Sequence, residues 1–151
     1  GARFVPDVVL TPHRGEAERL ARRLDIDPDL PAPELARALA AATGATVLLK
    51  GAITLVAPGD GGPLRSQDDA TPQLATAGTG DVLAGVLGTL LAAGLPGPDA
   101  AALAALLHGR AGRLASSDGL HPLVALDVAD SLPEAIGTIL ADAQDLNRGA
   151  R

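Results

Sequence analysis

ATAGTGDVLAG, residues 75–85, is the stretch of this sequence that decides the fold. The glycines at positions 78 and 80 allow a sharp turn whose backbone N–H groups point into one concavity. The apolar residues that follow are typical of a helix over 81–93. Because the free N–H groups and the positive dipole end of a helix favour a phosphate, the stretch predicts an anion site at Gly78 and Gly80.

Asp81 is the unusual member of this stretch. A carboxylate beside a phosphate site repels the ligand unless it has a chemical role, and one such role is that of general base toward a substrate hydroxyl. A second interpretation is that Asp81 only caps the helix. The spacing differs from both the P-loop and the dinucleotide fingerprint, since it lacks Gly-Lys-Ser/Thr and a third glycine. These residues alone leave both interpretations open.

Short strands and helices are predicted on either side of the turn. Strands are expected at 8–10, 46–50 and 53–56 with an edge strand within 63–75, and helices at 16–24, 34–43, 81–93, 99–115 and after an N-cap at Asp127. Gly51-Ala52 predicts a tight hairpin with a positive φ at Gly51. The alternation of strands and helices predicts an α/β layered domain with a mainly parallel sheet.

Length and composition restrict the class of protein. The 151 residues predict one domain over 1–144 with a frayed tail at 145–151. Phe4 is the only aromatic residue and cysteine is absent, so we expect an aliphatic core without disulfides or thiolate metal sites. The net charge of −6 without a basic stripe argues against a nucleic-acid partner. No membrane partner is expected, because the longest apolar run, 82–95, is shorter than the roughly 20 residues that span a bilayer. We expect a cytoplasmic protein.

Three segments together resemble one known family. Residues 75–85 resemble the anion-hole motif of the ribokinase-like superfamily, and most of all that of the ADP-dependent NAD(P)H-hydrate dehydratases. LTPHRGE at 10–16 resembles that family's Thr-Pro-His-x-Gly-Glu signature, and VLLKGAIT at 47–54 resembles its Leu-Lys-Gly-x-x-Thr segment. Residues 107–109 and 132–136 also fit the family's later helices. Three motifs in the family's order are far more specific than any one of them.

The resemblance implies a ribokinase-like three-layer α/β/α fold and a reaction. In this family, ADP phosphorylates the ring hydroxyl of hydrated NADH or NADPH, and loss of phosphate restores the nicotinamide, leaving AMP and phosphate. Two alternatives stand beside it. One is an ATP-dependent kinase of the same superfamily acting on a vitamin-precursor alcohol of the hydroxymethylpyrimidine or hydroxyethylthiazole type. The other is a nucleotide-binding or oligomerisation module without catalysis.

The resemblance also assigns roles to residues. Asp81 would be the catalytic base, and His13 and Asp81 would contact the hydrated cofactor. The AMP or ADP site would be formed by Lys50, Gly51, Ala52, Ile53, Thr54, Gly78, Thr79 and Gly80. Mg²⁺ would bridge the phosphates, as phosphoryl transfer generally requires, and no protein ligand to a metal is assigned. The structural interpretations are a loop histidine bonded to backbone for His13, a solvated strand end for Lys50 and a packed helix residue for His108.

The sequence also departs from the family pattern. Ala77 replaces the first glycine of the common Gly-Gly-Thr-Gly-Asp, and residues 70–73 read ATPQ where the family has Gly-Asn-Pro-Gly. Family members carry a long N-terminal half, so we expect this chain to be a C-terminal portion with an incomplete sheet, an exposed sheet edge and little activity alone. The family's tendency to form tetramers predicts a homo-oligomer.

Overall fold

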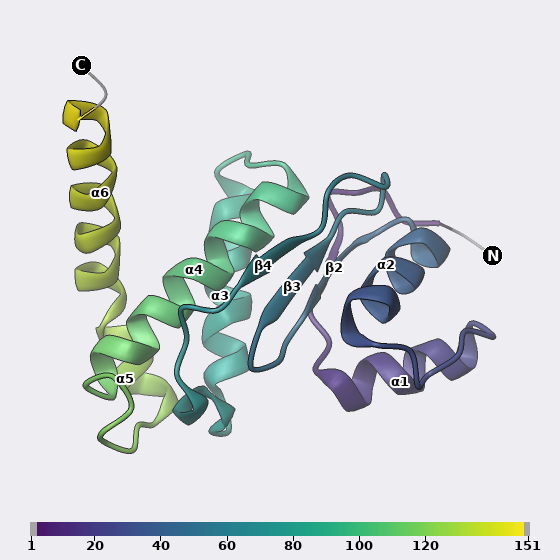
Figure 1. Ribbon diagram of the computed structural model, residues 1–151, viewed down its shortest axis with the longest axis horizontal. Coiled ribbons are helices and arrows are strands. Elements are labelled where there is room, and N and C mark those ends of the chain that lie inside the picture. The colour runs from purple at the N-terminus through teal and green to yellow at the C-terminus, as the bar shows by residue number, and fades with distance from the viewer. Residues whose placement is uncertain (1–2, 150–151) are drawn as a thin grey trace.

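The computed structural model describes residues 3–149, which form a four-stranded sheet flanked by helices (Figure 1). The elements are β1 (Val9–Leu10), α1 (Arg14–Arg23), α2 (Ala32–Thr43), β2 (Thr46–Leu49), β3 (Thr54–Ala57), β4 (Arg65–Gln67), the 3₁₀ helix η1 (Pro72–Ala75), α3 (Thr79–Ala92), α4 (Gly97–Ala115), α5 (Ala125–Asp130) and α6 (Leu132–Gly149). Within residues 3–149, no helix combines the length and the apolar character that a membrane crossing needs. The element bounds show that the predicted strands and helices are present, shifted by a few residues.

The sheet has the strand order β1-β2-β3-β4, so β1 and β4 lie at its edges. β1 pairs with β2 in parallel, whereas the β2–β3 and β3–β4 pairings are antiparallel. The prediction of a mainly parallel sheet is therefore wrong for these four strands. The connections explain this result, because only the segment containing α1 and α2 is long enough for a parallel crossover, while short loops join β2 to β3 and β3 to β4.

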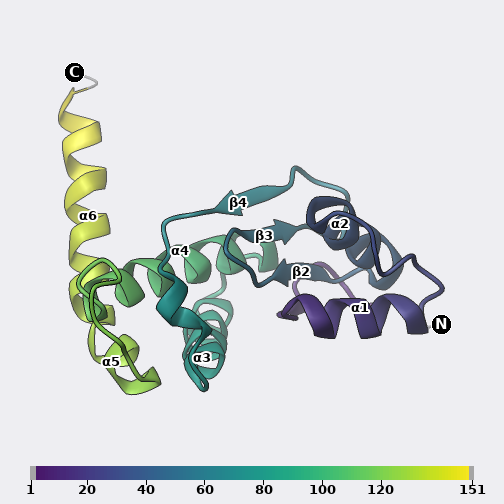
Figure 2. The ribbon, with the colours of Figure 1, turned by 60° about the horizontal axis from the view of Figure 1, so that its bottom comes forward.

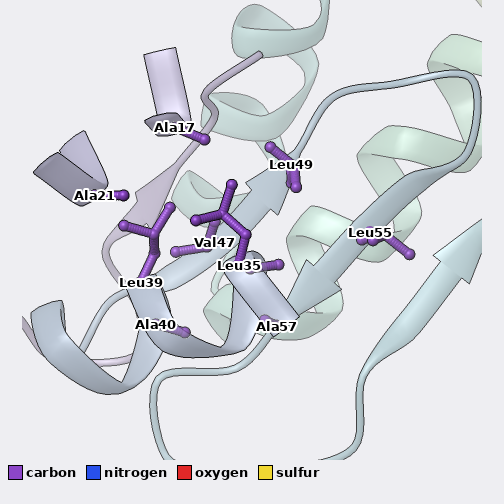
Figure 3. Packing of buried hydrophobic residues seen from close by; sticks show 10 residues of the cluster. Ala17, Ala21, Leu35, Leu39, Ala40, Val47, Leu49, Leu55 and Ala57 are labelled. Carbon is purple, nitrogen blue, oxygen red and sulfur yellow. The ribbon is translucent and has the colours of Figure 1, made fainter. Parts of the chain in front are cut away.

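Helices cover both faces of the sheet, as the layered fold requires. Val47 and Leu49 of β2 point to one face and pack with Leu35 and Leu39 of α2 in an aliphatic cluster (Figure 3). Leu48, between them in the chain, points to the opposite face and joins residues of α3 and α4. This alternation buries β2 on both sides. The three layers and the aliphatic core predicted from the sequence are confirmed, and Phe4, the only aromatic residue, is 52% exposed.

α5 and α6 pack beside the sheet rather than on it. Leu123, Val128 and Ala135 form a small buried cluster with Ala111 of α4. From this cluster α6 extends away from the rest of the molecule (Figures 1 and 2). α6 takes in residues 145–149 of the segment for which a frayed tail is predicted, and residues 150–151 lie outside the described part of the chain.

Two local predictions are corrected by the structure. β2 and β3 do form a hairpin, but Leu49 pairs with Leu55, so the connection is a wider loop, and Gly51 is not among the positive-φ residues. Asp127 is not the N-cap of α5. That position belongs to Val124, and Asp127 lies three residues further on, where its carboxylate accepts a hydrogen bond of 2.8 Å from the Val124 N–H. The acidic side chain caps the helix from inside its first turn.

Candidate functional site

The first turn of α3 is built on a left-handed glycine. Gly78 is the N-cap residue, with a φ of 86°. A side chain there is disfavoured twice, because L-residues rarely adopt this φ and because a Cβ would lie 3.1 Å from the Cβ of Ala125. The helix begins at Thr79, two residues before the predicted start. Gly78 therefore sets the direction in which the first N–H groups of α3 point.

Two N–H groups at this turn are free to bind an anion. The N–H groups of Asp81 and Val82 both donate to the carbonyl of Gly78, at 3.0 and 3.4 Å. Within residues 3–149, the N–H groups of Gly78 and Gly80 donate to no backbone or side-chain acceptor. Gly78 is exposed and Gly80 is half-buried. Unpaired donors at the positive end of a helix dipole form a site for an anion.

Lys50 brings a positive charge to the same place. Its backbone N–H donates to the Pro12 carbonyl at 2.9 Å, which holds the end of β2 against the segment that follows β1. Its ammonium nitrogen lies 3.5 Å from the position that a Cβ on Gly80 would occupy. Two of the segments singled out in the sequence therefore meet in space. The ammonium and the free Gly80 N–H together suit a phosphate oxygen.

Asp81 is exposed, and its carboxylate caps nothing. It occupies the third position of α3, and no side chain caps the N–H of Gly78. The acidic residues in the equivalent positions of α1 and α5, Glu16 and Asp127, both bond back to their N-cap residues. The side chain of Asp127 is long enough to bond to its N-cap residue, so an aspartate at the third position of α3 could do the same. The interpretation of Asp81 as a helix cap is therefore wrong, and its carboxylate is available to a ligand.

His13 lies at the same edge of the sheet, in an isolated parallel bridge with Lys50. It is the N-cap of α1, where its Nδ1 accepts from the Glu16 N–H at 3.3 Å and its own N–H donates to Glu16 Oε2 at 2.8 Å. This hydrogen bond from His13 is the main reason why the pKa of Glu16 lies below its usual value. The structural interpretation of His13 is confirmed, and its side chain remains 55% exposed.

Thr79 is hydrogen-bonded within the protein through its side chain and its backbone, since its N–H donates to the Thr76 carbonyl at 3.4 Å. Its side chain is buried, and its single hydroxyl proton is shared between the carbonyls of Leu74 and Thr76, whose oxygens lie 2.6 and 2.9 Å from the hydroxyl oxygen. These bonds fix η1 and the residues before Gly78, so the hydroxyl is not free for a nucleotide. Of the predicted nucleotide residues after Lys50, Gly51, Ala52 and Ile53 are exposed in the loop, and Thr54 is half-buried at the start of β3.

His108 is a buried residue to which the sequence assigned no role at the site. Its Nε2 lies 2.9 Å from the Thr79 carbonyl, which can only accept, so Nε2 carries the proton. Burial is the main reason why the pKa of His108 is lowered, and the positive charge of Lys50 lowers it further. A neutral His108 thus fastens α4 to the first turn of α3. The sequence signal that could have indicated this role is a single histidine surrounded by Leu and Ala on an apolar helix face.

Comparisons with known proteins agree on one family. A family model described as NAD(P)H-hydrate dehydratase matches residues 2–134. The chain is 49% identical over 110 residues to the bifunctional NAD(P)H-hydrate repair enzyme Nnr of Mycobacterium leprae, which covers 73% of this chain and 22% of that protein. It is 43% identical over 110 residues to the ADP-dependent (S)-NAD(P)H-hydrate dehydratase of Neisseria meningitidis serogroup B, covering 73% of this chain and 37% of that protein. The chain thus spans less than half the length of these curated relatives.

Solved structures agree on the fold. The ADP/ATP-dependent NAD(P)H-hydrate dehydratase from Bacillus subtilis, co-crystallised with ATP and Mg²⁺ and soaked with CoA, matches with a TM-score of 0.68 and 29% identity, over 87% of this chain and 48% of that one. A ribokinase-like superfamily protein from Enterococcus faecalis matches with a TM-score of 0.74 and 28% identity, over 89% of this chain and 45% of that one. The chain has the ribokinase-like fold that the motifs predicted.

Proposed function

Because this chain belongs to the NAD(P)H-hydrate dehydratase family, we propose that it provides the phosphate site and the general base for ADP-dependent dehydration of hydrated NADH or NADPH. One observation carries the proposal. The uncapped, exposed carboxylate of Asp81 stands next to the free N–H of Gly80, which the Lys50 ammonium approaches. Transfer of a phosphoryl group to an alcohol needs a base for the alcohol and donors for the phosphate oxygens. Here the base is a carboxylate, and the donors are an ammonium and backbone N–H groups at a helix N-terminus.

The proposed reaction has two stages. Asp81 accepts the proton of the ring hydroxyl while the hydroxyl oxygen bonds to the β-phosphorus of ADP, and the bond from that phosphorus to the bridging oxygen breaks, which releases AMP. The phosphorylated ring then loses a proton from the neighbouring carbon and expels phosphate, so the double bond of the dihydronicotinamide returns. The sum is hydrated NAD(P)H plus ADP giving NAD(P)H, AMP and phosphate. No electrons are transferred.

Each residue at the site has a distinct place in this proposal. The N–H groups of Gly78 and Gly80, with Lys50, bind the oxygens of the transferring phosphate. The exposed loop of Gly51, Ala52 and Ile53, followed by Thr54, lies against the AMP part of the nucleotide, and Thr79 holds the turn between Gly78 and Gly80 in shape. His13, fixed as the N-cap of α1 with its ring 55% exposed, contacts the hydrated cofactor together with Asp81.

We propose Mg²⁺ as the accompanying metal. No group of three or more His, Asp or Glu side chains within residues 3–149 is arranged to hold a metal ion. Mg²⁺ commonly keeps several waters and binds through substrate phosphates, so the phosphates of ADP would hold the ion without a dedicated cage of protein side chains. When bound, the ion would offset phosphate charge.

The proposal is tested by titrating the isotope-labelled chain with ADP and Mg²⁺ and by adding hydrated NADH while the NADH absorbance is followed. We expect the Gly78 and Gly80 amide resonances to shift and the absorbance to rise only slowly, in keeping with the low activity expected of this chain alone. Asp81→Asn should abolish the rise but keep ADP binding, and the matched control Asp29→Asn, in an exposed loop, should change neither. Shifts centred away from α3 would refute the site, and phosphorylation of a vitamin-precursor alcohol without NADH formation would favour the kinase alternative.

A further inference from the structure

Lys50 is the only lysine in the chain, and its other strongly basic side chains are arginines. An ammonium on a four-carbon stem is compact and strongly hydrated, and it has no planar fork to fix its direction. Left alone, such a side chain turns toward water. In the structure it nevertheless lies beside Gly80, with the side chain only 30% exposed. Something must hold it there.

Glu16 is the acidic group nearest to this ammonium among the described ion pairs. Glu16 Oε2 lies 4.0 Å from Lys50 Nζ. The same oxygen accepts the 2.8 Å hydrogen bond from the His13 N–H, and Oε1 lies 3.4 Å from His13 Nε2. The carboxylate is thus fixed to the first turn of α1, and its position does not depend on Lys50.

The two helix starts that meet at Lys50 are alike in sequence and different in charge. α1 begins Arg14-Gly15-Glu16 and α3 begins Thr79-Gly80-Asp81. Both ends carry the partial positive charge of a helix N-terminus, which disfavours a nearby ammonium. At α1 the inward-folded carboxylate of Glu16 offsets that charge, whereas Asp81 at α3 does not cap its helix. Among the ion pairs of residues 3–149, Glu16 is the one carboxylate within 4.0 Å of the Lys50 ammonium, so its charge favours this position before any ligand binds.

We propose that Glu16 is a positioning residue whose charge holds the Lys50 ammonium beside Gly80, so that an incoming phosphate meets a cation already in place. This inference rests on the proposed function for the identity of the anion as a nucleotide phosphate. The placement of Lys50 in the free protein does not depend on that identity. Glu16 touches neither the phosphate nor the reacting atoms in this scheme.

The test uses the fact that a single lysine gives a single set of side-chain signals. In the chain labelled with ¹³C-lysine, nuclear Overhauser contacts are measured from the Lys50 ε-methylene to the Gly80 α-protons without ligand. Glu16→Gln removes the charge but keeps an oxygen that can accept the His13 N–H. The matched control is Glu18→Gln, which removes the same charge from the same helix, where Glu18 pairs with Arg14 at 2.7 Å.

We expect Glu16→Gln to lose the Lys50–Gly80 contact and to weaken ADP binding, measured by calorimetry, by about two- to fivefold, the range of an exposed ion pair. Glu18→Gln should keep the contact and the affinity. The inference is overturned if Glu16→Gln keeps the contact, or if it loses the contact and binds ADP as tightly as the unaltered chain. If Glu16→Gln does not fold, rising NaCl on the unaltered chain replaces it, and a contact that does not weaken with salt overturns the inference.

The proposed function can fail separately. An unaltered chain that shows the Lys50–Gly80 contact but no response of the Gly78 and Gly80 amides to ADP would refute the nucleotide site and leave the placement of Lys50 by Glu16 standing.

Discussion

At the scale of single residues, the glycines of the α3 turn have different tasks although they are two positions apart. Gly78 is required by the backbone, because its φ is 86° and its neighbour Ala125 is close. Gly80 has no such requirement. It lies in the helix, and a methyl group there would make an ordinary contact of 3.5 Å with Lys50 Nζ. Because Gly80 has no side chain, an anion can approach its N–H closely.

Gly80→Ala should therefore separate binding from stability. Alanine in a helix is favoured over glycine by about 0.5–1 kcal/mol, so thermal unfolding should not occur at a lower temperature. ADP affinity, measured by calorimetry, should fall about tenfold or more, which is about 1.4 kcal/mol. Gly78→Ala should instead lower the free energy of unfolding by about 1 kcal/mol or more. Unchanged ADP binding in Gly80→Ala would place the anion elsewhere.

His108 gives the fold a dependence on pH. Its pKa in the folded protein is lowered from the ordinary value of about 6.5, so the unfolded chain takes up this proton first as the pH falls. The free energy of unfolding should then decrease from about pH 7 downward, by at most about 1.4 kcal/mol per pH unit, until the folded form is protonated too. Burial raises the pKa of Asp69, but hydrogen bonds from Arg110 and Arg113 lower it by more, so its pKa lies below the usual value. This carboxyl group changes the free energy of unfolding only below about pH 4, which is outside the range of His108.

Denaturant unfolding between about pH 5 and 7 measures this effect. His108→Gln keeps an N–H donor for the Thr79 carbonyl but does not titrate, so its unfolding free energy should vary less across the window. The control His121→Gln, an exposed position, should retain the slope of the unaltered chain. A slope in His108→Gln equal to that of the control would exclude His108 as its source.

At the scale of helices and strands, α4 determines how the segment before Gly78 lies. A Cβ on Gly112 would come within 2.7 Å of Leu74 side-chain atoms, and one on Gly109 within 2.5 Å of the Asp69 carbonyl oxygen. Residues 69–74 can therefore lie directly on α4 only because these helix positions lack side chains. Since the Thr79 hydroxyl bonds to the Leu74 carbonyl, this packing is transmitted to the start of α3.

Gly112→Ala should overpack this contact and lower the free energy of unfolding by about 1–3 kcal/mol. Gly88→Ala is the matched control, because it places the same methyl group in α3 where nothing lies within 4 Å. It should stabilise the protein by up to about 1 kcal/mol. Urea unfolding compares the two. Equal effects would show that Leu74 moves aside without cost.

The elements also show how far the sequence was informative. The hydrophobic period identified α2 and α4, and the glycine pattern identified the turn at Gly78, because these signals are local. The directions of the strands in the sheet could not all be predicted from propensity. The reversal between β2 and β3 was indicated by Gly51-Ala52, whereas the antiparallel pairing of β4 follows from the short connection after β3 and has no signal in the irregular stretch 63–75. The proximity of Lys50 to Gly80 and Glu16 depends on how distant segments pack together, which local patterns do not show. Only the family resemblance placed the motifs of Lys50 and Gly80 at one site.

At the scale of the whole molecule, α6 is the least integrated part. It packs on α4 and α5 near its start, where Ala135 is fully buried, and Asp142 lies 3.5 Å from Arg110 of α4, while the helix as a whole extends away from the sheet (Figure 1). Ile136 and Leu140 on this helix are 43% and 58% exposed. The homo-oligomer predicted from the family resemblance would give such side chains a partner surface, although the assembly stays a prediction.

We expect light scattering to give the mass of a homo-oligomer, a tetramer by the family's tendency. Leu140→Lys should shift the mass toward the monomer if α6 takes part in the assembly. Leu126→Lys, at an exposed position of α5, is the control and should leave the mass unchanged. A monomeric unaltered chain at all concentrations measured would contradict the prediction.

The composition of the whole chain has an optical consequence. With neither tryptophan nor tyrosine in the sequence, the polypeptide is nearly dark at the near-ultraviolet wavelengths used to record most proteins. The fluorescence of a reduced nicotinamide formed on it would not overlap with tryptophan or tyrosine emission. It would also receive no excitation energy from indole or phenol rings of the protein. Product appearing on this chain could thus be watched directly by its own fluorescence.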